Sequence, residues 1–207
     1  MRQNEPGIVE YYDLLAEDYD SRWVTFVDSQ QKVIKPFADK VKEAFGDNAR
    51  VADLGCGVGL NSYILSEIHD SNFTVMGVDI SKQMIKKAQK NCPKATCVHE
   101  NFLSWKTDSK FHGIVAGSFL NQFSSEMQPY VVEKMHDIME KGAYALVYAS
   151  DTQDFDDNKT VLLKKKPYMQ MVHRINVSDL LSQFFEVVDY YKGYGKRNWS
   201  IMLVRKK

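Results

Sequence analysis

The sequence predicts an α/β fold, in which a parallel sheet is covered by helices on both faces. Between residues 50 and 149, five short runs of strand-forming residues alternate with segments whose apolar residues recur at helical spacing. The connections between these runs are short enough for right-handed crossovers, which place successive strands parallel. The 207 residues suffice for one domain of this kind, and we see no linker or internal repeat that divides the chain.

Helices are expected ahead of the first strand. Residues 8–20 carry apolar and aromatic side chains at roughly helical spacing, and the apolar content continues through Trp23. Residues 30–45 have the pattern of a second helix with one apolar side. Pro36 lies inside this segment, and it should either kink the helix or mark its true start, because proline lacks the amide proton that a helix interior needs.

The core elements follow in alternation. After the strand at 50–54, a helical stripe begins near Leu60 and ends in the turn at 69–72. Ser81 is placed to cap the next helix, because its hydroxyl can accept from a free N–H group of the first turn. A further helix is expected at 127–139, and the other strands are expected at 73–79, 95–99, 111–116 and 142–149.

The last third of the chain has a different pattern. Residues 151–171 are polar and are expected to form an inserted loop or short hairpin over the carboxyl edge of the sheet. A short helix is expected at 177–184. Two strands, at 185–191 and 199–205, are joined by a segment that contains Gly193 and Gly195, which predicts an antiparallel hairpin.

The chain is organised around the segment from Val51 to Asn61, which contains three alternate glycines after a strand-like run. A strand that turns at once into a helix exposes backbone N–H groups, and glycine lets a ligand approach where a Cβ would collide. The next strand ends in Asp79, about 20 residues after the last glycine, where a carboxylate can hold a ribose through its hydroxyls. The two features together predict a nucleotide-sized site.

These motifs, with the downstream segments, resemble the class I S-adenosylmethionine-dependent methyltransferases that act on small molecules. The spacing Asp-x-Gly-x-Gly-x-Gly differs from the Gly-x-Gly-x-x-Gly of nicotinamide-binding loops. The resemblance implies a Rossmann-like parallel sheet closed by the C-terminal antiparallel hairpin. It also implies one domain at 1–207, with a helical cap at 1–46, a cofactor-binding core at 47–150, an insert over the active site at 151–176, and a C-terminal helix and hairpin at 177–207.

The resemblance implies S-adenosylmethionine as the cofactor. The glycine loop would admit its methionine end, which Asp53 would help to fix, and Asp79 would accept from both ribose hydroxyls. Asn101 stands where the family usually has Asp, although an amide can still bond to the adenine edge. The full set of expected cofactor-binding residues is Tyr19, Asp53, Gly55, Cys56, Gly57, Gly59, Asn61, Asp79, Ile80, Met84, Asn101, Phe102 and Ser118.

The acceptor is not identified by the sequence. A sulfonium already activates its methyl group, so catalysis is mostly alignment and exclusion of water, and a base is needed only for a protonated acceptor. The catalytic residues therefore stay unassigned. The aromatic content suggests a planar or partly apolar acceptor. Candidates for its pocket are Tyr11, Tyr12, Asn121, Gln122, Phe123, Tyr168 and His173.

Composition excludes several other classes. Lys plus Arg equals Asp plus Glu, at 27 each, which argues against a nucleic-acid partner, and the Asn/Asp-Pro-Pro-Tyr signature of enzymes that methylate DNA bases is absent. No segment has the apolar length of a membrane helix or the pattern of a signal peptide, so a cytoplasmic location is expected. Cys56, Cys92 and Cys97 lack metal-ligand spacing and are expected to be small buried side chains, with no metal bound.

Two other functions remain open at this point. Tyr130 and Lys134 have the Tyr-x-x-x-Lys spacing of short-chain dehydrogenases, with Ser118 upstream, although the glycine spacing and the terminal hairpin disfavour an NAD(P) enzyme. The domain can alternatively bind S-adenosylmethionine or a partner protein without turnover, because a fold does not by itself establish a reaction. The sequence does not establish the oligomeric state.

Overall fold

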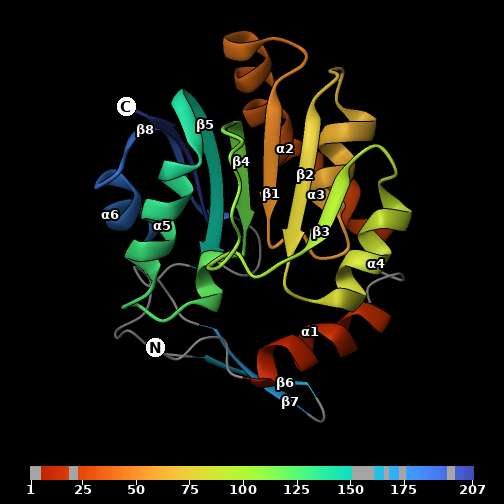
Figure 1. Cartoon of the computed structure of the whole chain (residues 1–207). Helices are drawn as coiled ribbons and strands as arrows, with labels where there is room; N and C mark the ends of the chain where they lie inside the picture. The colour runs from red at the N-terminus through yellow and green to blue at the C-terminus, as the bar shows by residue number, and fades with distance from the viewer. Residues whose placement is uncertain (1–5, 19–22, 151–160, 166–167, 173–175, 195–198) are drawn as a thin grey trace.

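A computed structural model describes residues 6–18, 23–150, 161–165, 168–172, 176–194 and 199–207 of the chain (Figure 1). It confirms the expected α/β fold with a seven-stranded sheet in the order β3-β2-β1-β4-β5-β9-β8. The five strands on the β3 side of this order are parallel, and β9 runs antiparallel to both β5 and β8. The strands are β1 (Arg50–Leu54), β2 (Thr74–Asp79), β3 (Thr96–His99), β4 (Phe111–Gly117), β5 (Met139–Ser150), β8 (Phe185–Tyr194) and β9 (Trp199–Lys206).

Helices cover both faces of the sheet (Figure 1). On one face lie α2 (Trp23–Phe45), α3 (Leu60–Tyr63) and the π-helical turn η1 (Ile64–Ile68), with α4 (Lys82–Asn91) beside α3. On the other face lie α5 (Gln128–Asp137) and α6 (Val177–Ser182). The layers enclose two large apolar clusters, one on each side of the sheet, and burial of this surface is the main driving force for the fold.

The second helix departs from the expected position. It begins at Trp23, ahead of the expected residue 30, and Pro36 lies inside it, so this proline does not mark the helix start. The reason is the packing of α2 on the sheet. Pro36 faces solvent, while Ile34, Phe37 and Val41 are at most 1% exposed in the apolar cluster where α2 packs against β4 and β5. Burial of these side chains offsets the cost of a proline in the helix interior.

The C-terminal hairpin of β8 and β9 has the expected antiparallel pairing, with Val187 opposite Val204. The polar segment before it contains a second hairpin, of β6 (Val161–Lys165) and β7 (Tyr168–Val172), which forms a separate two-stranded sheet. The expected loop or hairpin at 151–171 is therefore a hairpin in its described part. In the described part of the chain, no helix has the length and apolar character needed to cross a membrane.

Three segments lie at the carboxyl edge of the parallel strands (Figure 1). Helix α1 (Pro6–Asp18) lies beyond the strand ends, next to α4 and β7. The 3-10 turn η2 (Leu120–Gln122), which follows β4, lies against β5 and β7. The edge that the parallel strands share is thus surrounded by α1, the second hairpin and η2.

Candidate active site

The three glycines after β1 all have left-handed backbone conformations, with φ of 66° at Gly55, 54° at Gly57 and 89° at Gly59. Side-chain-bearing residues rarely adopt these angles, so the turn needs glycine at each position. The space around the glycines differs, however. A Cβ on Gly55 would lie 2.8 Å from Phe119 and one on Gly59 would lie 2.6 Å from Cys92 Sγ, whereas the nearest atom to a Cβ on Gly57 is Met84 Sδ at 4.0 Å.

Asp79 lies beside this loop at the end of β2. Its Oδ2 accepts from Gly57 N at 2.8 Å and its Oδ1 accepts from Ser81 N at 2.8 Å. Burial raises the pKa of the Asp79 carboxyl, and these two backbone N–H groups oppose that rise. A carboxylate has about four acceptor positions, so two remain for ligand hydroxyls. Ser81 caps α4, as expected, by accepting from Met84 N at 3.1 Å.

Asp53 lies under the loop and is fully buried. Asn61 Nδ2 donates to its Oδ1 at 3.2 Å, and the backbone N–H and hydroxyl of Ser62 donate to its Oδ2 at 3.0 and 2.7 Å. Burial raises the pKa of Asp53 from 3.8 to about 6, and the bonds from Ser62 and Asn61 limit the rise. Asp53 therefore holds the start of α3 against β1.

The adenine-side candidates lie near the ends of β2 and β3. Asn101 Oδ1 accepts from Leu103 N at 3.0 Å, so its side chain orders the turn after β3. Phe102 is 4% exposed and packs edge-to-face on Phe119, with ring centroids 5.4 Å apart. His99 Nε2 lies 2.9 Å from the carbonyl oxygen of Ile80.

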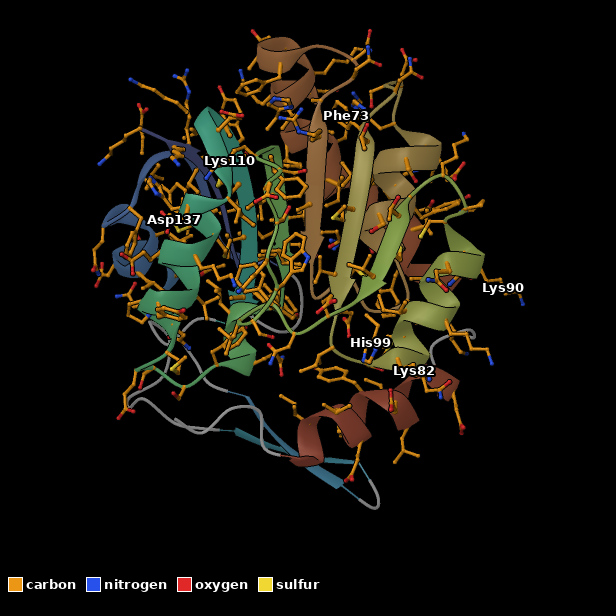
Figure 2. All side chains as sticks on the ribbon, viewed as in Figure 1. Phe73, Lys82, Lys90, His99, Lys110 and Asp137 are labelled. Carbon is orange, nitrogen blue, oxygen red and sulfur yellow. The ribbon has the colours of Figure 1, made fainter. Side chains whose placement is uncertain are left out.

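Figure 2 shows His99 near the first residue of α4, Lys82, at the edge of the sheet that faces α1. The labelled Phe73 and Lys110 lie at the opposite edge of the sheet. Met84, in the first turns of α4, is 2% exposed and packs with Val58 of the glycine loop and Ala16 of α1. Helix α1 is thus packed directly on two elements of the candidate cofactor site.

Ser118 follows β4 and has φ of 55°, the one positive φ outside glycine among the described residues. Its N–H donates to the carbonyl of Tyr148 at 2.8 Å, and Gln122 Nε2 donates to the Ser118 carbonyl at 3.0 Å. A left-handed serine costs about 1–2 kcal/mol, and such strain is concentrated at functional sites. Because β4 is the neighbour of β1, Ser118 and the glycine loop end at the same edge of the sheet.

Sequence reasoning missed Gln30, Ser62 and Tyr148. Gln30 Nε2 donates to Tyr148 Oη at 2.7 Å, and Tyr148 Oη donates to Asn61 Oδ1 at 3.0 Å. Tyr148 is the second-last residue of the expected fifth strand, at the carboxyl edge, and that position was a usable signal. Nothing in the local pattern distinguishes Gln30 from other polar residues of α2.

The elements that carry the acceptor candidates lie together. Strand β7, which contains Tyr168, lies next to both α1 and η2. Tyr11 and Tyr12 of α1 meet edge-to-face, with ring centroids 5.3 Å apart. Asn121 of η2 is 2% exposed, and the ring of Phe123 packs against Phe119. The side chain of Tyr168, and residues Tyr19 and His173, lie outside the described part of the structure.

The dehydrogenase-like pair is not arranged around the glycine loop. Lys134 Nζ donates to the carbonyls of Leu103 and Trp105, each at 2.9 Å, and Tyr130 is 51% exposed. Both residues lie on α5, which covers the face of the sheet opposite α3. The cysteines are buried as expected, and all three are free thiols.

Comparison with known proteins agrees with this geometry. Residues 51–142 match the model of a methyltransferase domain family. Over 104 residues the chain is 31% identical to an uncharacterized protein of Methanocaldococcus jannaschii, a match that spans 50% of this chain and 37% of the relative's length.

Solved structures share the fold. Magnesium protoporphyrin IX methyltransferase of Synechocystis, with bound S-adenosylhomocysteine, superposes with a TM-score of 0.72 at 14% identity, over 97% of this chain and 98% of that one. An amino pentose methyltransferase of Micromonospora echinaspora, with bound S-adenosylmethionine, gives 0.66 at 13% identity, over 84% and 90%. Residues 51–142 thus match a methyltransferase domain family, and the chain has the fold of these two S-adenosylmethionine-dependent enzymes.

Proposed function

We propose that this chain is a methyltransferase that transfers a methyl group from S-adenosylmethionine to a small-molecule acceptor. The observation that carries the proposal is the position of Asp79, whose carboxylate accepts from Gly57 N while it retains free acceptor positions. A ribose bound there would place its nucleoside beside the one glycine of the loop that leaves space for a ligand. The matched domain family and the cofactor-bound structures with this fold support the choice of ligand.

The reaction needs little chemistry from the side chains. A lone pair of the acceptor attacks the methyl carbon in line with the carbon–sulfur bond, and the electrons of that bond return to sulfur. S-adenosylhomocysteine is thereby released as a neutral thioether. Alignment of the two reactants supplies most of the catalysis, and an acceptor that is already nucleophilic needs no general base.

We further propose that α1, β7 and η2 form the acceptor pocket. These elements lie next to one another at the carboxyl edge and carry Tyr11, Tyr12, Tyr168 and Asn121. Solved structures of this fold include enzymes named for a magnesium porphyrin and for an amino pentose, which are both small molecules. In this proposal the chain is a single domain, and α1 and the β6–β7 hairpin are its cap and insert.

Calorimetry with S-adenosylhomocysteine tests the cofactor site. We expect wild-type protein to bind, and Asp79→Asn to weaken binding by about tenfold or more, because the variant loses two charge-assisted acceptors. Asp189→Asn is the matched control: Asp189 also accepts from a backbone N–H, that of Tyr190 at 2.8 Å, but it lies on the distant strand β8. Equal affinities for the three proteins would contradict the proposed site.

A second measurement tests turnover. The protein is incubated with S-adenosylmethionine and a panel of amines, phenols, thiols and carboxylates, and formation of S-adenosylhomocysteine is followed. Methyl transfer to one class supports the proposal and identifies the acceptor atom. Tight cofactor binding without transfer to any member of a broad panel would instead indicate a binding domain without turnover.

A further inference from the structure

A closed ring of three polar side chains joins elements that are far apart in the sequence. Gln30 of α2 donates through Nε2 to Tyr148 Oη at 2.7 Å and to Asn61 Oδ1 at 3.2 Å. Tyr148 of β5 donates its hydroxyl proton to Asn61 Oδ1 at 3.0 Å. The amide of Gln30 has two protons and the phenol has one, so the three bonds are compatible with one another.

The ring controls the orientation of Asn61. Its Oδ1 accepts from both partners in the ring, and its Nδ2 donates to buried Asp53 at 3.2 Å. A reversed amide would turn a donor toward two donors and an acceptor toward a carboxylate, so only one orientation satisfies the network. Asn61 lies in the first turn of α3, directly after the glycine loop. The ring therefore connects α2 and β5 to that loop.

The phenol of Tyr148 also crosses the end of β4. Tyr148 pairs with Gly117, and a Cβ on Gly117 would lie 2.1 Å from Tyr148 Oη. Glycine at 117 is thus required by the close approach of the phenol. The next residue is the left-handed Ser118, whose N–H donates to the carbonyl of Tyr148. Tyr148 contacts both loops, the one after β1 through Asn61 and the one after β4 through Gly117 and Ser118.

Strand order indicates which end of the cofactor lies near the ring. Asp79 is on β2, and the sheet continues from β2 through β1 and β4 to β5, which carries Tyr148. A nucleoside whose ribose is held by Asp79 must extend its sulfur and amino-acid chain either away from the sheet centre or toward β4 and β5. The room for an added Cβ at Gly57 and the strained Ser118 favour the second direction.

We propose that Tyr148 and Gln30 are positioning residues for the amino-acid end of the cofactor. They act by fixing Asn61 and the distance between the loops after β1 and β4. This inference rests on the proposed cofactor site. Both residues lie outside the sequence motifs and would help to align the sulfur with the acceptor. Their loss should weaken the binding of ligands that carry the amino-acid chain.

The test compares two ligands. S-adenosylhomocysteine carries the amino-acid chain, whereas 5′-methylthioadenosine has the same nucleoside and a thioether sulfur without that chain. We expect Tyr148→Phe to lower the affinity for S-adenosylhomocysteine by about three- to tenfold. The affinity for 5′-methylthioadenosine should fall by less than about twofold. Tyr190→Phe is the matched control, because it removes the hydroxyl of a tyrosine outside the ring, on the edge strand β8, that lies 3.2 Å from Ser200 Oγ.

Gln30→Leu provides an independent variant, because it breaks the same ring from α2. It should reproduce the ligand selectivity of Tyr148→Phe. The double variant should lose affinity for S-adenosylhomocysteine by less than the product of the two single fold-changes, because both changes break the same ring. Equal weakening of both ligands, or no weakening of either in proteins with wild-type melting temperature, would overturn the inference. Failure of the wild-type protein to bind S-adenosylhomocysteine would overturn the proposed function itself.

Discussion

Alanine substitutions at Gly57 and Gly59 should separate the ligand-binding part of the glycine loop from its structural part. Both glycines have left-handed backbone angles, with φ of 54° and 89°, and both changes add one methyl group. A left-handed alanine costs about 1–2 kcal/mol of folding stability at either position. Any further difference between the variants therefore reports the surroundings of the added Cβ.

Those surroundings differ in a measurable way. At Gly59 the Cβ would lie 2.6 Å from Cys92 Sγ and 3.2 Å from the backbone Cα of Ala88, so α3 and α4 must separate. Overpacking of this kind adds about 1–3 kcal/mol, for a total of about 2–5 kcal/mol. At Gly57 the nearest atom is at 4.0 Å, and the backbone term of about 1–2 kcal/mol stands alone. For a chain of this size, about 1 kcal/mol shifts Tm by about 2–4 °C.

Thermal unfolding and calorimetry with S-adenosylhomocysteine measure the two effects. We expect Gly59→Ala to lose more stability, and Gly57→Ala to lose more affinity, because its methyl group occupies the space proposed for the ligand. The affinity of each variant is measured below its own unfolding transition, so that loss of folded protein does not enter. The reasoning would be refuted if Gly57→Ala bound the ligand like wild type, or if Gly59→Ala were the more stable of the two.

Three further predictions test other parts of the site. Asp53→Asn removes a carboxyl whose pKa is raised by burial from 3.8 to about 6. As pH rises from about 4 to about 6, the stability of the wild-type protein should fall by about 3 kcal/mol relative to the variant. Urea unfolding measures both stabilities, and the same pH dependence for the two proteins would contradict this. Ser81→Ala should cost about 1 kcal/mol of stability through the lost cap of α4, and it should expose α1 to proteolysis because Ser81 Oγ donates to Asp13 of that helix; unchanged digestion would refute the α1 contact. Lys134→Met should lower stability by about 1–3 kcal/mol, because two carbonyls lose their donor, and it should leave cofactor affinity unchanged. A rise in the Tm of the wild-type protein with NAD, and none with S-adenosylhomocysteine, would instead support the dehydrogenase alternative.

The parts of the molecule that the sequence predicts are those with local signals. The glycine spacing, the terminal Asp79 and the cap at Ser81 each depend on residues within one turn, and the structure has each of them in the expected element. The start of α2 was not predictable in this way. The helix continues through Pro36 because it packs on the sheet, and the strands of that sheet are distant in sequence. The same limit applies to the pair of Gln30 and Tyr148, which are 118 residues apart and are joined by one hydrogen bond.

The glycine pattern also shows what a motif leaves undetermined. The spacing pattern does not distinguish the three glycines from one another, and all three have the positive φ that the pattern implies. The surroundings nevertheless differ: a Cβ on Gly55 would clash with Phe119, a Cβ on Gly59 would clash with Cys92, and Gly57 alone has room for one. A spacing rule can detect a turn of this kind, but the role of each residue depends on neighbours that only the folded chain supplies.

The charge of the proposed cofactor would explain the burial of Asp53. Its carboxylate is fully buried and receives neutral donors from Asn61 and Ser62, and no Lys, Arg or His in the described segments forms an ion pair with it. A buried charge without a cation costs stability, as its raised pKa of about 6 indicates. S-adenosylmethionine carries both a sulfonium and an ammonium group, and either would stabilise the ionised form if it lay above the loop. Binding should therefore release protons near pH 6, and S-adenosylhomocysteine, which lacks the sulfonium, should release fewer. Calorimetry in buffers of different ionisation enthalpy measures that difference, and equal proton release for the two ligands would place the sulfur beyond the reach of Asp53.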